Sequence, residues 1–140
     1  MSVNINNVVK SLLLADGPLM SVLTGGVHDT SEITRQLAPT AFDANGEIKP
    51  CALVKSGNET AMQHKIQAVQ TPVVIYLYER SGYAAIDAAL ARIYTLLDQR
   101  HIGASGVWEA QFNTEIARLT DEGLKCSLGT QRWNLIRKRA

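Results

Sequence analysis

The segment PVVIYLYERSGYAAIDAALARIYTLLDQ, from Pro72 to Gln99, constrains the fold more than any other part of the chain. Val73 to Tyr78 is a continuous apolar run of mostly β-branched and aromatic residues, which predicts a buried β-strand. After a turn at Ser81-Gly82, apolar residues spaced by four, three and four share one face of a predicted helix: Ile86, Leu90, Ile93 and Leu97. A strand followed directly by a helix that packs back on it indicates a two-layer α/β sandwich.

Length and charge favour one globular domain, residues 1–140. Hydrophobic residues make up 46% and charged residues 19% of the 140 residues, which is enough apolar surface for a core without metal or disulfides. The 14 basic and 13 acidic side chains nearly cancel, which argues against a nucleic-acid-wrapping protein and leaves self-association little opposed. No apolar run is long enough for a membrane span, and no secretory signal is seen, so we expect a cytoplasm-like compartment. Cys51 and Cys126 are expected to be small buried hydrophobes.

The amino-terminal half predicts helices followed by an irregular stretch. Asn4, Asn6 and Asn7 can N-cap a first helix that ends at residues 16–18, and its inward residues would be Val8, Val9, Leu12 and Leu13. A short helical turn from Leu19 to Leu23 and an extended piece at Val27-His28 follow. Residues 29–50 show poor periodicity. We expect them to be a long excursion on the surface, with a tight turn at Asn45-Gly46.

The remaining segments predict strands. Residues 51–54 form a short one, and His64 to Gln70 shows the alternation of a half-exposed strand. Pro72 cannot donate a ladder hydrogen bond, so this extended segment is either bent there or at a sheet edge, and it could project as an arm or a hairpin. Val107 to Leu119 fits both a helix and a strand, but the turn at residues 121–123 and the alternation beyond it favour a closing hairpin. The predicted fold class is α/β (α+β): a mostly antiparallel sheet with helices packed on one face.

No catalytic, cofactor or metal motif is present in the sequence. The three histidines, His28, His64 and His101, lie in or beside predicted loops without the signature of a nucleophile and its base. Gly25-Gly26 is not accompanied by the further glycines or the lysine of a phosphate loop, and we interpret it as a helix end. No paired Cys or His spacing indicates a metal site.

Three features are candidate surfaces for an oligomer or partner interface. The first is a polar stretch that could add as a strand to a neighbour's sheet, or be a plain edge strand: Gln63, His64, Lys65, Ile66 and Gln67. The second is Trp108 (and with it Trp133), which could anchor an interface or belong to the core. The third is the basic carboxyl-terminal segment, which could meet an acidic partner or be a solvated terminus: Arg132, Arg137, Lys138 and Arg139.

The order of elements resembles a known family. An amino-terminal helix running into ADGPLMSVLTGGV, a loop, the strand PCALVKSG and the unit PVVIYLYERSGYAAIDAALARIYTLL are similar to the tail-terminator and tail-completion proteins of long-tailed bacteriophages, over about Val8 to Leu97. The resemblance implies an α/β fold and hexameric rings that cap the tail tube, stop its polymerisation and join the head connector. It also implies a virion protein assembled in the host cytoplasm, with a tail tube protein and a head-tail connector or neck protein as partners. It implies no catalytic residue and no cofactor. DNA could pass through such a ring without a direct binding site.

Other functions stay open at this point. Within the same structural class, the chain could be a neck or head-completion protein, or a tail tube subunit. A different class is a small enzyme or ligand-binding domain with a pocket between the alanine-rich helix and the sheet, although that helix offers few polar residues besides Arg92 and Tyr94. A nucleic-acid-binding module would depend on the basic segment alone.

Overall fold

The structure is a computed structural model that describes residues 4–63, 66–98 and 107–138. Its centre is one six-stranded sheet with the order β1-β2-β4-β6-β5, and β3 pairs with β4 outside this path. The elements are α1 (Ile5–Leu14), α2 (Gly17–Val22), β1 (Val27–His28), the 3₁₀-helix η1 (Pro39–Ala41), β2 (Cys51–Ser56), β3 (Thr60–Gln63), β4 (Ile66–Glu79), α3 (Ala84–Leu97), β5 (Val107–Asp121) and β6 (Cys126–Lys138). All neighbouring strands are antiparallel except β1 and β2. The predicted fold class is therefore confirmed.

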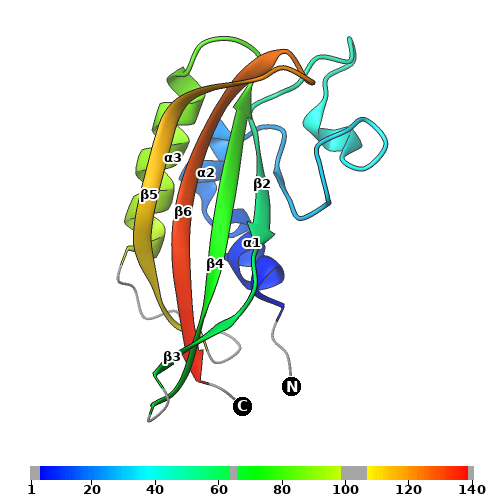
Figure 1. The fold of residues 1–140 in the computed structure, drawn as a ribbon. Helices are drawn as coiled ribbons and strands as arrows, with labels where there is room; N and C mark the ends of the chain where they lie inside the picture. Colours follow the sequence, from blue (N-terminus) through cyan, green and yellow to red (C-terminus); the bar gives the residue numbers. More distant parts are fainter. Residues whose placement is uncertain (1–3, 64–65, 99–106, 139–140) are drawn as a thin grey trace.

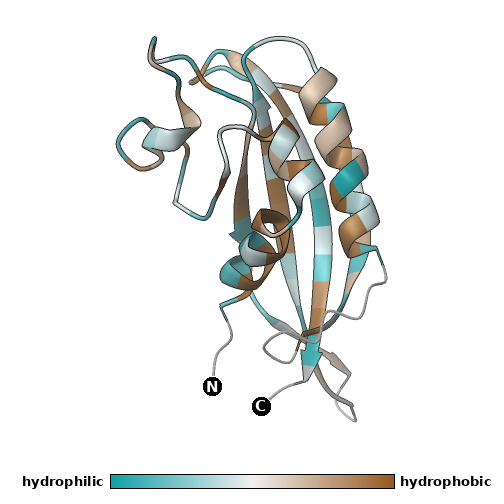
Figure 2. Ribbon diagram, turned by 180° about the vertical axis from the view of Figure 1, so that it is seen from behind, coloured by the Kyte–Doolittle hydropathy of each residue, from teal (hydrophilic) through white to brown (hydrophobic). Residues whose placement is uncertain are grey.

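The three α-helices cover one face of the sheet, as Figures 1 and 2 show from opposite sides. The side chain of Asn4 caps α1 by accepting a hydrogen bond from the backbone N–H of Asn7 at 3.1 Å. Asp16 caps α2 in the same way through Leu19, at 3.0 Å, and its carboxylate also accepts two hydrogen bonds from the Arg92 guanidinium of α3, at 2.7 and 2.8 Å. One aspartate thus joins the start of α2 to α3.

The main core lies between these helices and the sheet. On α3 it takes the predicted residues Ile86, Leu90, Ile93 and Leu97, which are all buried. The facing sheet residues are Ala52 and Val54 of β2, Val73, Ile75 and Leu77 of β4, and Trp133 and Leu135 of β6. They alternate along each strand, as residues on one face must. The predicted strand and helix at the centre of the chain are therefore confirmed.

Pro72 lies inside β4 without breaking it. Its carbonyl accepts a hydrogen bond from the backbone N–H of Gly57 at 2.8 Å, so its peptide groups point away from β6 and towards residue 57. The pairing of β2 ends at Ser56 and that of β3 begins at Thr60, which leaves a gap in the neighbouring strand at this point. Because proline has no N–H to return to Gly57, the ladder between β2 and β4 stops here, where the neighbouring strand changes from β2 to β3. Beyond it, β3 and the start of β4 form a hairpin that projects past the body of the sheet (Figure 1).

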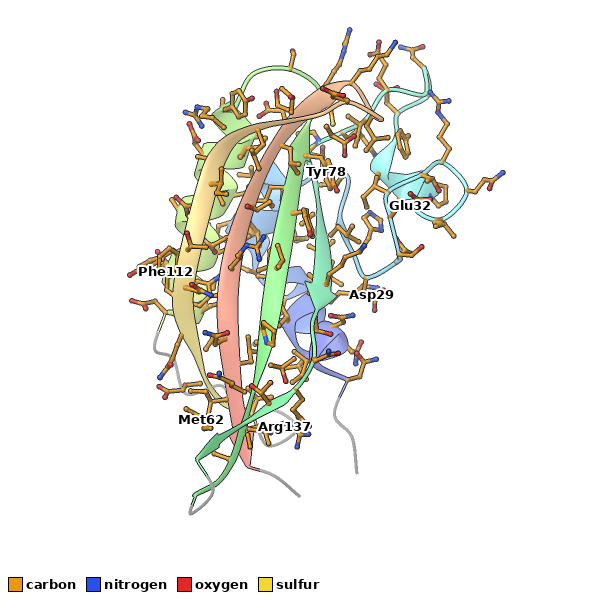
Figure 3. All side chains as sticks on the ribbon, in the orientation of Figure 1. Asp29, Glu32, Met62, Tyr78, Phe112 and Arg137 are labelled. Atoms are coloured by element: carbon orange, nitrogen blue, oxygen red, sulfur yellow. The ribbon has the colours of Figure 1, made fainter. Side chains whose placement is uncertain are left out.

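Residues 29–50 form the expected excursion, since most of them are exposed or half-buried, but four of them anchor it to the sheet. Four of their side chains are at most 7% exposed and form a second core: Ile33, Ala38, Ala41 and Ile48. This core packs on the sheet face that the helices leave free, against Cys51, Leu53 and Tyr78, and Tyr78 is labelled beside the segment in Figure 3. The predicted turn at Asn45-Gly46 is present, with Gly46 at a φ of 76°.

The closing hairpin is also confirmed, because β5 and β6 pair along nearly their whole lengths. The register shifts at three places, between Val107 and Glu109, Phe112 and Thr114, and Ile116 and Leu119. Such β-bulges bend a strand and increase its twist. Among the described residues, no helix is long and apolar enough to cross a membrane.

Candidate functional site

The described residues of the predicted polar stretch, Gln63, Ile66 and Gln67, belong to the paired strands β3 and β4 of the projecting hairpin. Gln63 is the last residue of β3 and pairs with Ile66, the first residue of β4. His64 and Lys65 lie outside the described residues, and nothing is described of the side chain of Gln67. Met62, beside this stretch, is 40% exposed and lies near the lower end of the molecule in Figure 3. The structure therefore places Gln63, Ile66 and Gln67 in paired strands, and the role of the stretch in binding stays a prediction.

The basic carboxyl-terminal segment is not a solvated terminus as far as residue 138, because it forms β6 beside the centre of the sheet. Arg132 is exposed, whereas Arg137 is only 5% exposed and forms an ion pair with Glu59. Their spacing of five residues places them on opposite faces of β6. The structure does not bring these two arginines together, and the side chain of Lys138 lies outside the description.

The two tryptophans also differ from each other in what the structure describes. Trp133 is fully buried, as the core interpretation predicted, whereas the side chain of Trp108 on β5 is not described. Its role as an interface anchor stays a prediction.

A different surface stands out, which the sequence interpretation did not select. It is the outer edge of β5 together with the neighbouring side of α3, and we call it the β5 flank. Six consecutive residues of β5, from Gln111 to Ile116, are exposed. Within the described residues, no strand pairs with the outer side of β5, apart from a single bridge between Asp98 and Ala110. A long strand edge of this kind is a ready template for another polypeptide.

Three of the six exposed large apolar side chains in the described part of the chain lie on the β5 flank. Tyr94 of α3 is 41% exposed, and Phe112 and Ile116 of β5 are 39% and 45% exposed. Phe112 lies at the outer side of β5 in Figure 3. Together with their neighbours, Tyr94 and Phe112 line a groove of about 400 Å³ between α3 and β5, whose other lining residues are Asp87, Leu90, Ala91, Glu115 and Ala117. Exposed apolar residues gathered around a groove are typical of binding surfaces.

Buried contacts hold the groove in place. The ring of Phe112 meets the rings of Tyr94 and Trp133 edge-on, with centroids 5.2 and 5.5 Å away. Trp133 donates its indole N–H to the side-chain oxygen of Gln131 at 2.8 Å. The amide nitrogen of Gln131 donates in turn to Glu115, at 2.8 Å, and to the carbonyl of Leu90 on α3, at 3.1 Å. One buried glutamine therefore fixes β5, β6 and α3 relative to one another.

The rim of the groove is acidic. Asp87, in the first turn of α3, accepts two hydrogen bonds from Arg118 of β5, at 2.6 and 2.9 Å, which hold the pKa of its carboxyl below the ordinary value. The guanidinium of Arg118 also lies over the ring of Tyr83, 4.6 Å from its centroid. The charge of Asp98, partial burial and the hydrogen bond between the phenol and Asp98 raise the pKa of Tyr94 above its ordinary value.

A cavity of about 500 Å³ lies at the other end of the sheet, between residues 34–48 and the β5–β6 turn. Its charged lining residues are Arg35, Arg80, Lys125 and Glu47. Arg80 is paired with Glu47 at 2.8 Å, and Arg35 donates to the carbonyl of Gly46 at 2.6 Å. In the described part of the chain, no group of three His, Cys, Asp or Glu residues could hold a metal ion. The lining charges are therefore largely engaged with one another and with the backbone.

Both cysteines are buried beside this cavity, in the second core. Burial raises the pKa of the Cys51 thiol to about 12 and that of Cys126 to about 11. Because the thiolate is the reactive form, we expect neither thiol of the folded protein to react with dithiobis(nitrobenzoate) at about pH 8, whereas both should react at once in denaturant. A rapid stoichiometric reaction of the folded protein would contradict the burial of these residues.

Comparisons with known proteins find the same fold in a virion. No protein-family model matches the chain, and no curated protein is similar to it in sequence. Among solved structures, a chain described as "Virion of native gene transfer agent (GTA) particle" is similar in structure, with a TM-score of 0.67. The alignment covers 96% of this chain and 94% of that chain at 18% sequence identity. At this identity the likeness shows a shared fold, and it extends over nearly the whole of both chains.

Proposed function

We propose that this protein is a structural component of a phage-like virion and forms a closed ring, a hexamer, at the end of the tail tube. The observation that carries the proposal is the end-to-end similarity of its fold to a chain of a gene transfer agent particle. The resemblance of residues 8–97 to phage tail terminators points in the same direction and supplies the finer role. In that role the ring stops polymerisation of the tube and joins it to the head connector.

The geometry supports an assembly protein. A ring of identical subunits needs two different, complementary surfaces on each copy, and it closes when the rotation per step divides a full turn. The β5 flank offers an exposed apolar groove and an open strand edge on one side of the sheet. The opposite side offers the edge of β2 and the projecting β3–β4 hairpin. A net charge of +1 places little repulsion between copies.

The size of the assembly and its effect on tube length test this function. Mass photometry of the purified protein, alone and mixed with the tail tube protein of the same particle, should show a hexamer. Particles assembled without it should carry tubes of uncontrolled length in electron micrographs. A protein that stays monomeric alone and with the tube, and whose loss leaves tube length unchanged, would contradict the proposal. Rings stacked along the whole tube would identify a tube subunit instead, and rings confined to the head would identify a neck protein.

A further inference from the structure

We propose that the β5 flank of one copy binds the opposite sheet edge of the next copy, namely residues 54–63, which comprise the end of β2 and the strand β3. We call this second surface the β2–β3 edge. The inference rests on the ring of the proposed function and adds which two surfaces meet in it. A second copy of this chain therefore occupies the groove between α3 and β5.

Topology makes the two surfaces different and places them at opposite edges of one sheet. The order β1-β2-β4-β6-β5 ends at β5 on one side, and β3 pairs with β4 on the side of β2. The two-residue strand β1 pairs only with Ala52 and Leu53, so in the described residues no strand covers the end of β2. A contact between two different edges is heterologous and repeats from copy to copy, whereas a β5-to-β5 contact would stop at a dimer.

Apolar side chains are available on both surfaces. The groove on the β5 flank is bordered by the half-exposed rings of Tyr94 and Phe112. Met62, the large exposed apolar residue of the β2–β3 edge, is 40% exposed. A flexible thioether fits irregular apolar gaps and makes favourable contacts with aromatic rings. Burying Met62 against these rings would remove apolar surface on both copies from water.

Charge also favours this pairing over contact between like surfaces. The β5 flank carries four carboxylates, Asp87, Asp98, Glu109 and Glu115, and one cation, Arg118, which is paired with Asp87. The β2–β3 edge carries the exposed cation Lys55, and its carboxylate at Glu59 is paired with Arg137. Two β5 flanks would bring like charges together, whereas the β2–β3 edge brings a lysine to an acidic rim. Complementary potentials of this kind select one partner surface and disfavour others.

Thiol cross-linking between copies tests the pairing. One variant carries Met62→Cys, and a second carries Asn113→Cys at an exposed position on the outer edge of β5. The native Cys51 and Cys126 are 0% and 5% exposed, so a bismaleimide should report the introduced thiols alone. The matched control is Leu37→Cys, which replaces a side chain as exposed as Met62, in the segment between β1 and β2. The assembly state of each preparation is checked by mass photometry before cross-linking.

An equimolar mixture of the Met62→Cys and Asn113→Cys proteins should give a covalent dimer, and each protein alone should give little. The variant with both substitutions should give a ladder that ends at the ring. Rings that form normally but cross-link no better than the Leu37→Cys control would overturn the pairing and leave the ring function standing. Dimers formed by Asn113→Cys alone would overturn it in favour of a two-fold contact. Absence of any assembly, alone and with the tube protein, would instead overturn the proposed function and the pairing with it.

Discussion

Replacing Trp133 by alanine is expected to lower the free energy of unfolding by about 3–5 kcal/mol, the range for removal of a large aromatic residue from a core. Trp133 is fully buried, and its ring lies between the helix layer and β5, where it contacts Tyr94 and Phe112. The substitution also removes the N–H donor to the buried side-chain oxygen of Gln131, and an unpaired buried acceptor is costly, so we expect a loss in the upper part of this range. Urea unfolding followed by far-ultraviolet circular dichroism would measure the loss, provided that the slope with denaturant stays the same.

The matched control is Trp133→Phe, which keeps an aromatic ring but has no N–H donor. We expect it to cost about 1–3 kcal/mol, chiefly because the oxygen of Gln131 loses its partner. Both variants must be compared at one protein concentration, because assembly of the folded state adds apparent stability. A loss below about 1 kcal/mol for Trp133→Ala would show that the aromatic cluster is not part of the core.

The parts of the fold that were predictable from sequence are those fixed by local periodicity. The strand from Val73 to Tyr78 and the helix that begins at Ala84 follow from spacings within one element, and the structure confirms both. The burial of four residues within residues 29–50 was not predictable, because Ile33, Ala38 and Ile48 have no period of their own. Their burial depends on Tyr78 and Cys126, which lie far away in the chain.

The candidate site was missed for a related reason. Whether a strand lies at the edge or the centre of a sheet depends on the topology of the whole chain, so the pattern from Val107 to Leu119 and the turn after it predict a strand but not an open edge. The burial of Arg137 was not predicted, because its partner Glu59 is distant in sequence and because this burial follows from the position of β6. One signal was available: Phe112 and Ile116 stand in an otherwise polar run, QFNTEI, where a half-exposed strand would leave them near water.

A close contact between α3 and β6 at Gly129 leads to the second large effect. Gly129 of β6 faces Ile86, and a Cβ atom added to this glycine would lie 2.6 Å from the Cγ2 of Ile86. The Cγ2 methyl group of Ile86 cannot easily move aside, because Ile86 is 1% exposed and belongs to the main core. Glycine at position 129 therefore sets how closely the helix packs on β6. Valine there should push α3 outwards and lower the free energy of unfolding by about 3 kcal/mol, the upper part of the range for overpacked cores.

A double-mutant cycle would show whether the loss comes from this contact. Ile86→Ala alone should cost about 2–5 kcal/mol, because it leaves a cavity under α3. In that background Gly129→Val should cost clearly less than it does in the natural chain, since the valine side chain enters the vacated space and the coupling between the two changes is favourable. Gly17→Val is the matched control, because nothing lies within 4 Å of the added Cβ, and it should change stability by no more than about 0.5 kcal/mol. Equal costs of Gly129→Val in both backgrounds would contradict the close contact. The loss would then come from a change within the strand itself and not from displacement of the helix.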